Sequence, residues 1–315
     1  MKLTVFNDEA AWLAARHRNI NSTEVAALFG LGQYSTAFEL AVSKRQETPT
    51  AFEESDRMRW GKRLQDAIAQ GVADDHGVII EGLDLTYAEH DETRLGSSFD
   101  YRIKDHVPED RSGMLYAMVH DRGPGILEIK NVDGLQYKRA WLDDEAPAQI
   151  EIQLQTQLEV LDMPWGCIAA LIGGNRTELI IRERDHEVGR SIVAKVAEFW
   201  KNLDAGILPP PIMPEDAAII TSLYQYAEPG KVLDATGDEG FRGLCLAYSA
   251  ASSLASTAKK QQEVARAKLF ERLGSAERAI VEGFKVSAAM VAPVEVKSHT
   301  RAGYRGLRVT EKADG

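Results

Sequence analysis

The sequence predicts an α/β or α+β fold, because helical and strand periodicities alternate along the first two thirds of its 315 residues. Helix-like segments come first, and a group of short strand-like segments follows. One more helix-like segment then separates that group from two further strands. This order predicts a central mixed sheet flanked by helices. Apolar residues make up 44% of the chain and charged residues 27%, which is typical of globular proteins, so wholesale disorder is excluded.

Capping residues and apolar periodicity predict four helices before the first strand. Asn7 and Asp8 can cap the first helix, and Ser22 and Thr23 can cap the second, which Gly30 ends. The fourth helix is the longest, and its apolar residues lie on roughly one face. The predicted helices cover residues 7–19, 22–30, 36–44 and 53–74.

Short β-rich stretches separated by Gly, Asp and Glu predict a meander after these helices. A glutamine-rich helix follows the meander, and two more strands and an amphipathic helix follow that. The predicted strands cover residues 77–81, 84–90, 95–103, 114–119, 126–130, 166–172 and 177–183. The predicted helices cover residues 147–161 and 187–203.

Three consecutive prolines at 209–211 cannot continue a helix, and they predict a stiff, extended joint. We therefore expect one domain over residues 1–208 and a smaller C-terminal extension over residues 209–315. The extension is predicted to contain a small sheet beside one long polar helix. Its predicted elements are a helix over 239–273 and strands within 280–296 and 304–309.

Composition narrows the classes of protein to which the chain could belong. It contains no run of about 18 apolar residues and no N-terminal signal segment, so we expect a cytoplasmic protein without a membrane anchor. Its two cysteines, Cys167 and Cys245, are too few for a four-thiolate zinc site or iron–sulfur cluster. The net charge of −11 is unusual for a nucleic-acid-binding protein, which usually has a basic surface.

Two charged residues interrupt the apolar strand expected over 126–130. Strand alternation places Glu128 and Lys130 on one face. With Asp100 on a neighbouring strand, they form a set suited to metal-assisted phosphodiester hydrolysis. The carboxylates would hold Mg²⁺ or Mn²⁺, and the ammonium would orient water or stabilise the transition state. The same three residues could instead form a surface salt bridge at a strand edge. Burying unpaired charges costs several kcal/mol, however, which favours a functional reason for them.

The same residues resemble the D…(D/E)-x-K core of the restriction-endonuclease-like nuclease superfamily. Three further segments narrow this resemblance to the YqaJ-like viral recombinase family, which includes the lambda-type phage exonuclease. They are residues 22–31 (STEVAALFGL), 58–62 (MRWGK) and 153–158 (QLQTQL). The order and spacing of the motifs agree over roughly residues 12–205, so the resemblance implies a restriction-endonuclease-like core for the main domain.

The resemblance implies a role for each residue of the motif. Asp100 and Glu128 would be metal-binding carboxylates, and the main-chain carbonyl of Ile129 would be a further ligand. Lys130 would be the catalytic lysine. Gln153 would position water or substrate near the metal. On the same helix, Gln157 shares the face of Gln153 and is a supporting candidate, whereas Gln155 points elsewhere.

The resemblance also implies a site for the 5′-phosphate of a DNA end, formed by a basic residue and two hydroxyls. The matching positions are Arg16, Thr23 and Ser98, with Arg18 as an alternative to Arg16. The sequence departs from the family at Gln65, where a Glu is usual. An amide brings no charge to a metal site. Either Asp66 or another acid compensates, or metal binding and catalysis are weakened.

By resemblance, the chain is a Mg²⁺-dependent exonuclease of double-strand DNA ends, and Mn²⁺ could replace Mg²⁺. It would degrade the 5′-ended strand and leave a 3′ single strand for a single-strand annealing protein in phage-type recombination. A homo-oligomeric ring around DNA is expected. The alternative is a catalytically weakened scaffold of the same fold that binds DNA ends or protein partners. A CRISPR-associated or RecB-like nuclease with an iron–sulfur cluster is disfavoured by the two distant cysteines.

Overall fold

The computed structural model describes residues 1–48, 54–107, 113–141, 145–293, 305, 307 and 309. The chain forms two compact units, Met1–Ile219 and Ile220–Gly315. Residues 209–219 fold with the first unit, because the buried Asp216 accepts hydrogen bonds from the Thr36 hydroxyl (2.6 Å) and the Ile212 amide (2.6 Å). The domain division at 208/209 stays a prediction.

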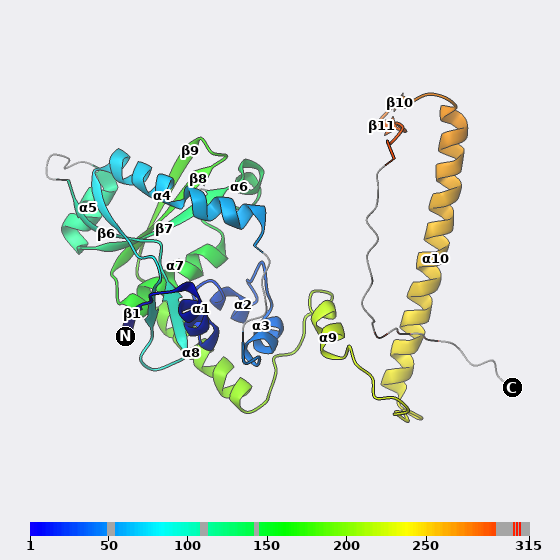
Figure 1. The fold of residues 1–315 in the computed structure, drawn as a ribbon, viewed down its shortest axis with the longest axis horizontal. Helices are drawn as coiled ribbons and strands as arrows, with labels where there is room; N and C mark the ends of the chain where they lie inside the picture. Colours follow the sequence, from blue (N-terminus) through cyan, green and yellow to red (C-terminus); the bar gives the residue numbers. More distant parts are fainter. Residues whose placement is uncertain are drawn as a thin grey trace. The chain divides into compact units, whose positions relative to one another are not determined.

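A five-stranded mixed sheet forms the centre of the first unit (Figure 1). In spatial order its strands are β3 (Val78–Gly82), β6 (Tyr101–His106), β7 (Gly125–Val132), β8 (Trp165–Ile172) and β9 (Arg176–Glu183). Strands β7 and β8 run parallel and the other neighbours antiparallel. The predicted mixed sheet with flanking helices is therefore confirmed.

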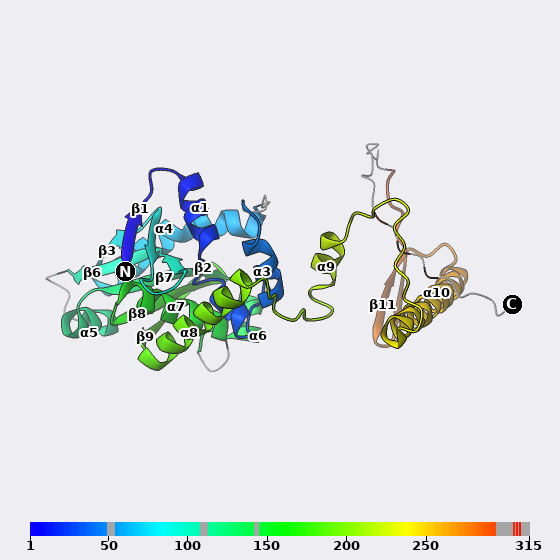
Figure 2. The same cartoon turned by 90° about the horizontal axis from the view of Figure 1, so that it is seen from below.

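Helices cover both faces of this sheet. Helices α4 (Asp56–His76) and α5 (Gly113–Arg122) pack on one face, and α7 (Ala148–Leu161) and α8 (His186–Asp204) belong to the core on the other. Figures 1 and 2 show α4 and α8 on opposite sides of the strands. Ser55 caps α4 and Asp185 caps α8 through their side chains.

Strand β7 contributes to both cores because its side chains alternate. Leu127 and Ile129 belong to the core beneath α4, whereas Ile126 packs in the core that includes α7. Glu128 and Lys130 share the face of Ile126 and follow it along the strand. Both charges therefore lie beside α7.

A second, four-stranded sheet places Asp100 beside β7. Its order is β1 (Lys2–Val5), β4 (Thr86–Glu89), β5 (Leu95–Ser98) and β2 (Ile20–Asn21). The single strand predicted over 95–103 is in fact two strands, since the chain leaves β5, passes through Phe99 and Asp100, and enters β6 of the other sheet. Asp100 thus lies at the junction of the two sheets.

The remaining elements of the first unit are short helices. They are α1 (Glu9–Arg18), α2 (Val25–Leu28), α3 (Ala37–Lys44) and α6 (Gly134–Ala140). Asp8 caps α1 as predicted. Neither Ser22 nor Thr23 caps α2, which begins after Glu24 without a side-chain cap. Ser22 instead accepts a hydrogen bond from the Ser97 hydroxyl (2.7 Å).

The strand predicted over 114–119 is wrong, because these residues form helix α5. Leu115 and Val119 are the buried members of this helix, and their spacing of four residues places them on one face. A six-residue apolar run fits a strand equally well, so only packing beneath the sheet distinguishes the two structures.

The second unit contains a long helix over the predicted residues 239–273 and a small hairpin. The hairpin overlaps only the start of the strand region predicted within 280–296, since residues 288–293 form no strand. Helix α10 (Glu239–Leu273) has no buried residue, and β10 (Arg278–Val281) pairs with β11 (Phe284–Ser287). The short helix α9 (Ala217–Leu223) spans the boundary between the units. Half of the strand expected over 304–309, at positions 304, 306 and 308, lies outside the described residues. Within the described ranges, no helix is long and apolar enough to cross a membrane.

Candidate active site

Glu128 is the most deeply buried charged group of the site, with 3% of its surface exposed. One carboxylate oxygen accepts hydrogen bonds from the Lys130 ammonium (2.5 Å) and the Gln153 amide (2.6 Å). The other accepts from the Gln157 amide (2.7 Å). A buried carboxylate without partners would cost several kcal/mol, so these three donors make its burial tolerable.

Helix α7 supplies both glutamines from one face. Gln153 and Gln157 are four residues apart and reach the same carboxylate, as the helical spacing predicts. Gln155 faces elsewhere, donating to the Glu183 carbonyl (2.9 Å) and accepting from the Asp185 amide (2.8 Å). Gln157 also donates to the Ser98 carbonyl (3.2 Å), which links the site to the end of β5.

Asp100 reaches the site from the junction of the two sheets. Asp100 immediately precedes β6, and one of its carboxylate oxygens accepts a hydrogen bond from the Ile129 amide of β7 (2.8 Å). The N–H and C=O of one strand residue face the same neighbouring strand. The Ile129 carbonyl therefore faces the side of β7 on which Asp100 lies. Ile129 itself is not paired with β6, because Leu127 is the last residue of β7 in that pairing.

Electrostatics couple these groups. The pKa of Asp100 is raised to about 7, chiefly by burial and next by the nearby Glu128 carboxylate, against the opposing effect of Lys130. Burial alone would lower the pKa of Lys130, but Glu128 and Asp100 outweigh it and the pKa is raised. Lys130 is therefore a protonated ammonium ion, and the two carboxylates repel each other.

The supporting candidates on α4 take different positions. The Gln65 amide donates to the second oxygen of Asp100 (3.1 Å). Asp66 instead accepts a hydrogen bond from the Tyr101 hydroxyl. No sequence motif points to Asp84, which lies in the turn before β4. Asp84 lines the same cleft as Asp100 and Glu128 and contributes to the raised pKa of Asp100.

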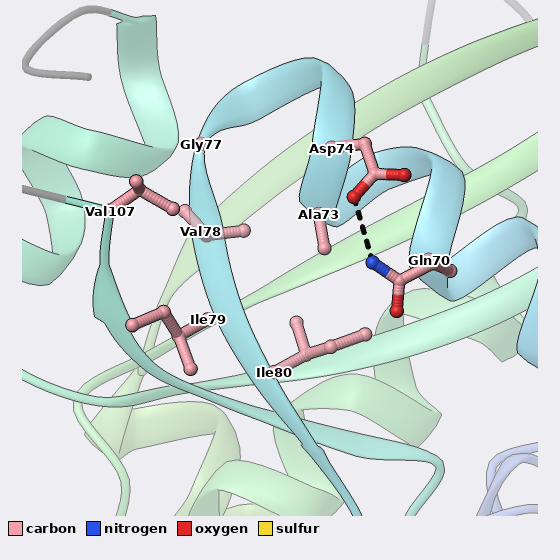
Figure 3. Close-up of a pocket in the computed structure, with 8 residues that line it drawn as sticks. All are labelled: Gln70, Ala73, Asp74, Gly77, Val78, Ile79, Ile80 and Val107. Carbon is pink, nitrogen blue, oxygen red and sulfur yellow. Dashed lines mark hydrogen bonds between the residues drawn. The ribbon is translucent and has the colours of Figure 1, made fainter. Parts of the chain in front are cut away.

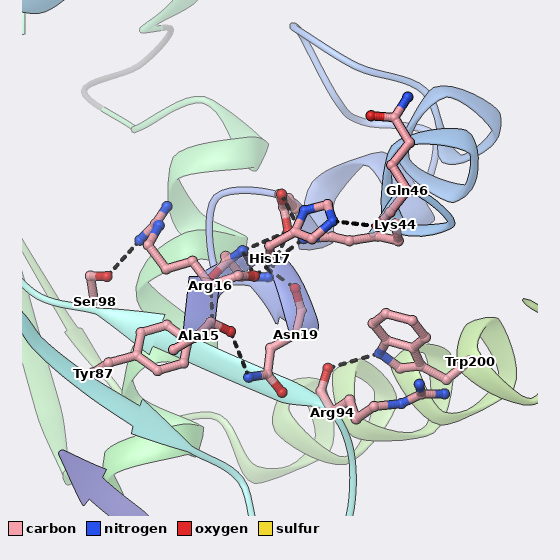
Figure 4. Close-up of polar contacts among 12 residues, drawn as sticks. Ala15, Arg16, His17, Asn19, Lys44, Gln46, Tyr87, Arg94, Ser98 and Trp200 are labelled. Carbon is pink, nitrogen blue, oxygen red and sulfur yellow. Dashed lines mark hydrogen bonds and ion pairs between the residues drawn. The ribbon is translucent and has the colours of Figure 1, made fainter. Parts of the chain in front are cut away.

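Two of the three residues predicted to bind a 5′-phosphate are in direct contact. The Arg16 guanidinium donates to the Ser98 hydroxyl (2.5 Å), as Figure 4 shows, and stacks over the Trp12 ring at 4.7 Å. Burial lowers the pKa of Arg16, although Glu24 opposes this effect. Thr23 is exposed and lines the same cleft as Arg16 and Ser98. Arg18 is also exposed, but it does not line this cleft.

A polar network fixes the end of α1 from which Arg16 projects. The Arg16 carbonyl accepts from the Asn21 amide (2.9 Å) and the Lys44 ammonium (3.3 Å). Lys44 is almost fully buried and pairs with Glu24 at 2.9 Å. Figure 4 shows Lys44 and Asn19 on either side of this helix end. The guanidinium is thus held by its backbone as well as by Ser98.

All the predicted site residues except Gln157 and the alternative Arg18 line one cleft of about 650 Å³. We call it the catalytic cleft. Its acidic lining consists of Glu9, Asp66, Asp84, Asp100 and Glu128. A hollow of similar volume between α4 and β3 contains none of the predicted residues (Figure 3). Its one carboxylate, Asp74, accepts a hydrogen bond from Gln70 (2.8 Å).

The oxygen ligands of the catalytic cleft fit a hard divalent cation. Within the described ranges, no three His, Cys, Asp or Glu side chains converge as a ready-made metal site. Mg²⁺ does not need one, because it usually binds through one or two carboxylates and keeps several waters. Asp100, Glu128 and the Ile129 carbonyl supply such a set, and a cation would relieve the repulsion that raises the pKa of Asp100.

Comparison with known proteins shows which family this chain resembles. Residues 11–164 match the family model of the YqaJ-like viral recombinase domain. Over 232 residues, the chain is 27% identical to the uncharacterized protein YqaJ of Bacillus subtilis (strain 168). That match covers 71% of this chain and 66% of the relative, so it spans slightly less than two thirds of the relative's length. The family resemblance predicted from the motifs is confirmed.

Solved structures with a similar arrangement include an alkaline exonuclease, LHK-Exo, from Laribacter hongkongensis, which has also been solved in complex with dAMP. It shares 18% identity and a TM-score of 0.49, over 62% of this chain and 93% of that chain. A phage related exonuclease from Haemophilus somnus 129PT shares 14% identity and a TM-score of 0.43, over 59% of this chain and 94% of that chain.

Proposed function

We propose that this chain is a Mg²⁺-dependent DNA exonuclease that acts on double-strand ends, with Mn²⁺ able to replace Mg²⁺. The observation that carries this proposal is the clustering of Asp100, Glu128 and Lys130 with Gln153 in one cleft that also contains Arg16 and Ser98. The match to a viral recombinase domain supports DNA as the substrate.

Each group has its own chemical role. Asp100, Glu128 and the Ile129 carbonyl would hold the cation, which when bound offsets charge on the phosphate and lowers the pKa of water. Lys130 carries a fixed positive charge toward the scissile phosphate. Gln153 bridges Glu128 and Lys130 and holds both in place, accepting from the ammonium at 3.1 Å. Gln157 anchors the other Glu128 oxygen.

Arg16, Ser98 and Thr23 would hold the terminal 5′-phosphate. A guanidinium is suited to this task because it offers several donors to one phosphate. Because the Arg16–Ser98 pair and Lys130 line one cleft, a strand anchored by its 5′-phosphate would present its first internal phosphate near the ammonium. This arrangement favours 5′→3′ degradation, which leaves 3′ single strands.

The wider role follows from this polarity. The 3′ single strands would pass to a single-strand annealing protein in phage-type recombination, in the cytoplasm. A homo-oligomeric ring would keep the enzyme on DNA. The net charge of −11 then requires that cationic side chains be concentrated at the DNA-binding surface.

A gel assay of linear duplex tests the proposal. Duplex with 5′-phosphates should shorten in Mg²⁺ and stay intact in EDTA, and duplex with 5′-hydroxyl ends should shorten more slowly. Labelling either strand reports the polarity. Equal degradation with and without the divalent cation would refute the proposed function.

The scaffold alternative depends on Gln65, whose amide occupies the place beside Asp100 where the family usually has a carboxylate. Gln65→Glu should increase Mg²⁺ affinity, by roughly the 10- to 100-fold that a neighbouring ligand contributes, and should raise the cleavage rate if the missing charge limits catalysis. Calorimetric Mg²⁺ titration and initial rates measure both effects, with Gln70→Glu on the same helix as control. If Gln65→Glu is neutral in both measurements, Gln65 is not the cause of a weakened site.

The raised pKa of Asp100 predicts a pH dependence of metal binding. In the metal-free protein this carboxyl binds a proton below about pH 7 and loses it above. A cation must displace that proton, so Mg²⁺ affinity should rise about tenfold per pH unit up to about pH 7 and then level off. Calorimetric titration over this range measures the slope. Asp100→Asn should remove the slope, and a flat profile for the native protein would show that Asp100 is ionised throughout.

A further inference from the structure

A second cleft, of about 490 Å³, adjoins the catalytic cleft. The two clefts share Thr23, Lys130, Asn131 and Gln153 in their linings. Lys130 therefore lies at the border between the two clefts. We call the second one the amide-rich cleft, and its polar lining includes Gln33, Tyr34, Arg57, Gln136, Arg139 and Gln149.

The two clefts differ in charge. Five carboxylates line the catalytic cleft, whereas no described Asp or Glu lines the amide-rich cleft. Its charged groups are Arg57, Arg139 and Lys130, in a chain whose net charge is −11. A cleft with cations and neutral amides attracts phosphate without the need for a metal.

Hydrogen bonds between elements hold this lining in position. The Arg57 guanidinium at the start of α4 donates to the Gln136 amide oxygen of α6 (2.6 Å). Gln149 of α7 donates to the Gln33 amide oxygen (2.6 Å), which ties down the loop before α3. Tyr34 on that loop is 79% exposed, so its ring is open to stacking by a base.

We propose that the amide-rich cleft binds the DNA strand on the 3′ side of the scissile bond, with Arg57 and Arg139 on its phosphates and Tyr34 against a base. This inference rests on the proposed function. The terminal 5′-phosphate would occupy Arg16 and Ser98 on one side of Lys130, and the reacting phosphate would lie at Lys130 itself. The strand then continues on the other side of Lys130, where this cleft lies.

Binding without catalysis tests the inference. Fluorescence anisotropy in EDTA measures the affinity for 5′-phosphorylated DNA with a short single-stranded 5′ end, at several salt concentrations. The double variant Arg57→Gln/Arg139→Gln should bind more weakly, and its slope of log affinity against log salt should fall by about 1.4 to 1.8, that is, by about 0.7 to 0.9 for each lost phosphate contact. Tyr34→Ala should lose about 5- to 150-fold in affinity. In both variants, the preference for 5′-phosphate over 5′-hydroxyl ends should stay unchanged.

The matched control is Arg190→Gln/Lys201→Gln, which removes two exposed charges of α8 that line neither cleft. The inference is overturned if the arginine variant keeps the native salt slope or behaves like this control. It is also overturned if the variant loses the 5′-phosphate preference, because the cleft would then bind the terminal phosphate. Native protein that binds DNA through this cleft yet cleaves nothing in Mg²⁺ would refute the proposed function alone.

Discussion

Glu128→Gln is expected to abolish cleavage and divalent-cation binding together. The Glu128 carboxylate accepts three hydrogen bonds, one of them from the Lys130 ammonium. A Gln side chain has the same shape, but its NH₂ group would face hydrogen-bond donors, and the negative charge of the carboxylate would be lost. Losing a metal-ligating charge removes several kcal/mol of transition-state stabilisation, so the cleavage rate should fall by about 10³-fold or more.

Calorimetric Mg²⁺ titration and single-turnover cleavage of 5′-phosphorylated duplex measure the two losses. Glu198→Gln, an exposed substitution on α8, is the matched control and should leave both unchanged. A melting temperature near the native value shows that the fold persists. Native Mg²⁺ affinity in a folded Glu128→Gln protein would contradict the assignment of Glu128 as a ligand.

Local periodicity explains why much of this site is predictable from the sequence. Strand alternation puts Glu128 and Lys130 on one face, and helical spacing puts Gln153 and Gln157 on another face that meets it. The observed hydrogen bonds among these four side chains follow those two periodicities. No long-range information was needed except that α7 packs beside β7, which the parallel β7–β8 crossover implies.

Contacts between segments that are far apart in the chain are harder to predict from the sequence. Arg16 meets Ser98 across 82 residues only because α1 packs beside β2 and β4 of the sheet that contains β5, and the family motifs rather than spacing suggest the pair. Asp84 has no motif and lies in a turn, so only the fold brings it to the cleft. The helix at 114–119 was missed because a short apolar run has no distinguishing period.

The net charge of the chain does not describe how its charged residues are distributed over the surface. The catalytic cleft concentrates carboxylates, which suit a cation, while the adjoining amide-rich cleft carries arginines and amides. The electrostatic potential at a site is set mainly by charged groups within roughly one Debye length, about 8 to 10 Å in physiological salt. A net negative chain can therefore still bind phosphate in a cleft lined by cations. Binding confined to such a cleft should weaken steeply as salt rises.

Lys130→Met is expected to remove cleavage while leaving cation binding in place. Methionine keeps most of the length of the side chain, and Glu128 retains two amide donors, from Gln153 and Gln157. With the competing ammonium gone, Mg²⁺ affinity should stay the same or increase, because one oxygen of Glu128 is released from an ion pair of 2.5 Å. The cleavage rate should still fall by about 10²- to 10³-fold, the usual effect of removing one preorganised electrostatic donor.

The contrast with Glu128→Gln separates the two roles, since one variant loses metal and rate and the other loses rate alone. Lys195→Met, an exposed substitution on α8, controls for the lost charge and should cleave normally. The same titration and single-turnover assays apply. If Lys130→Met lost Mg²⁺ affinity as completely as Glu128→Gln, the lysine would act by holding Glu128 in place, and its charge would have no direct part in phosphodiester hydrolysis.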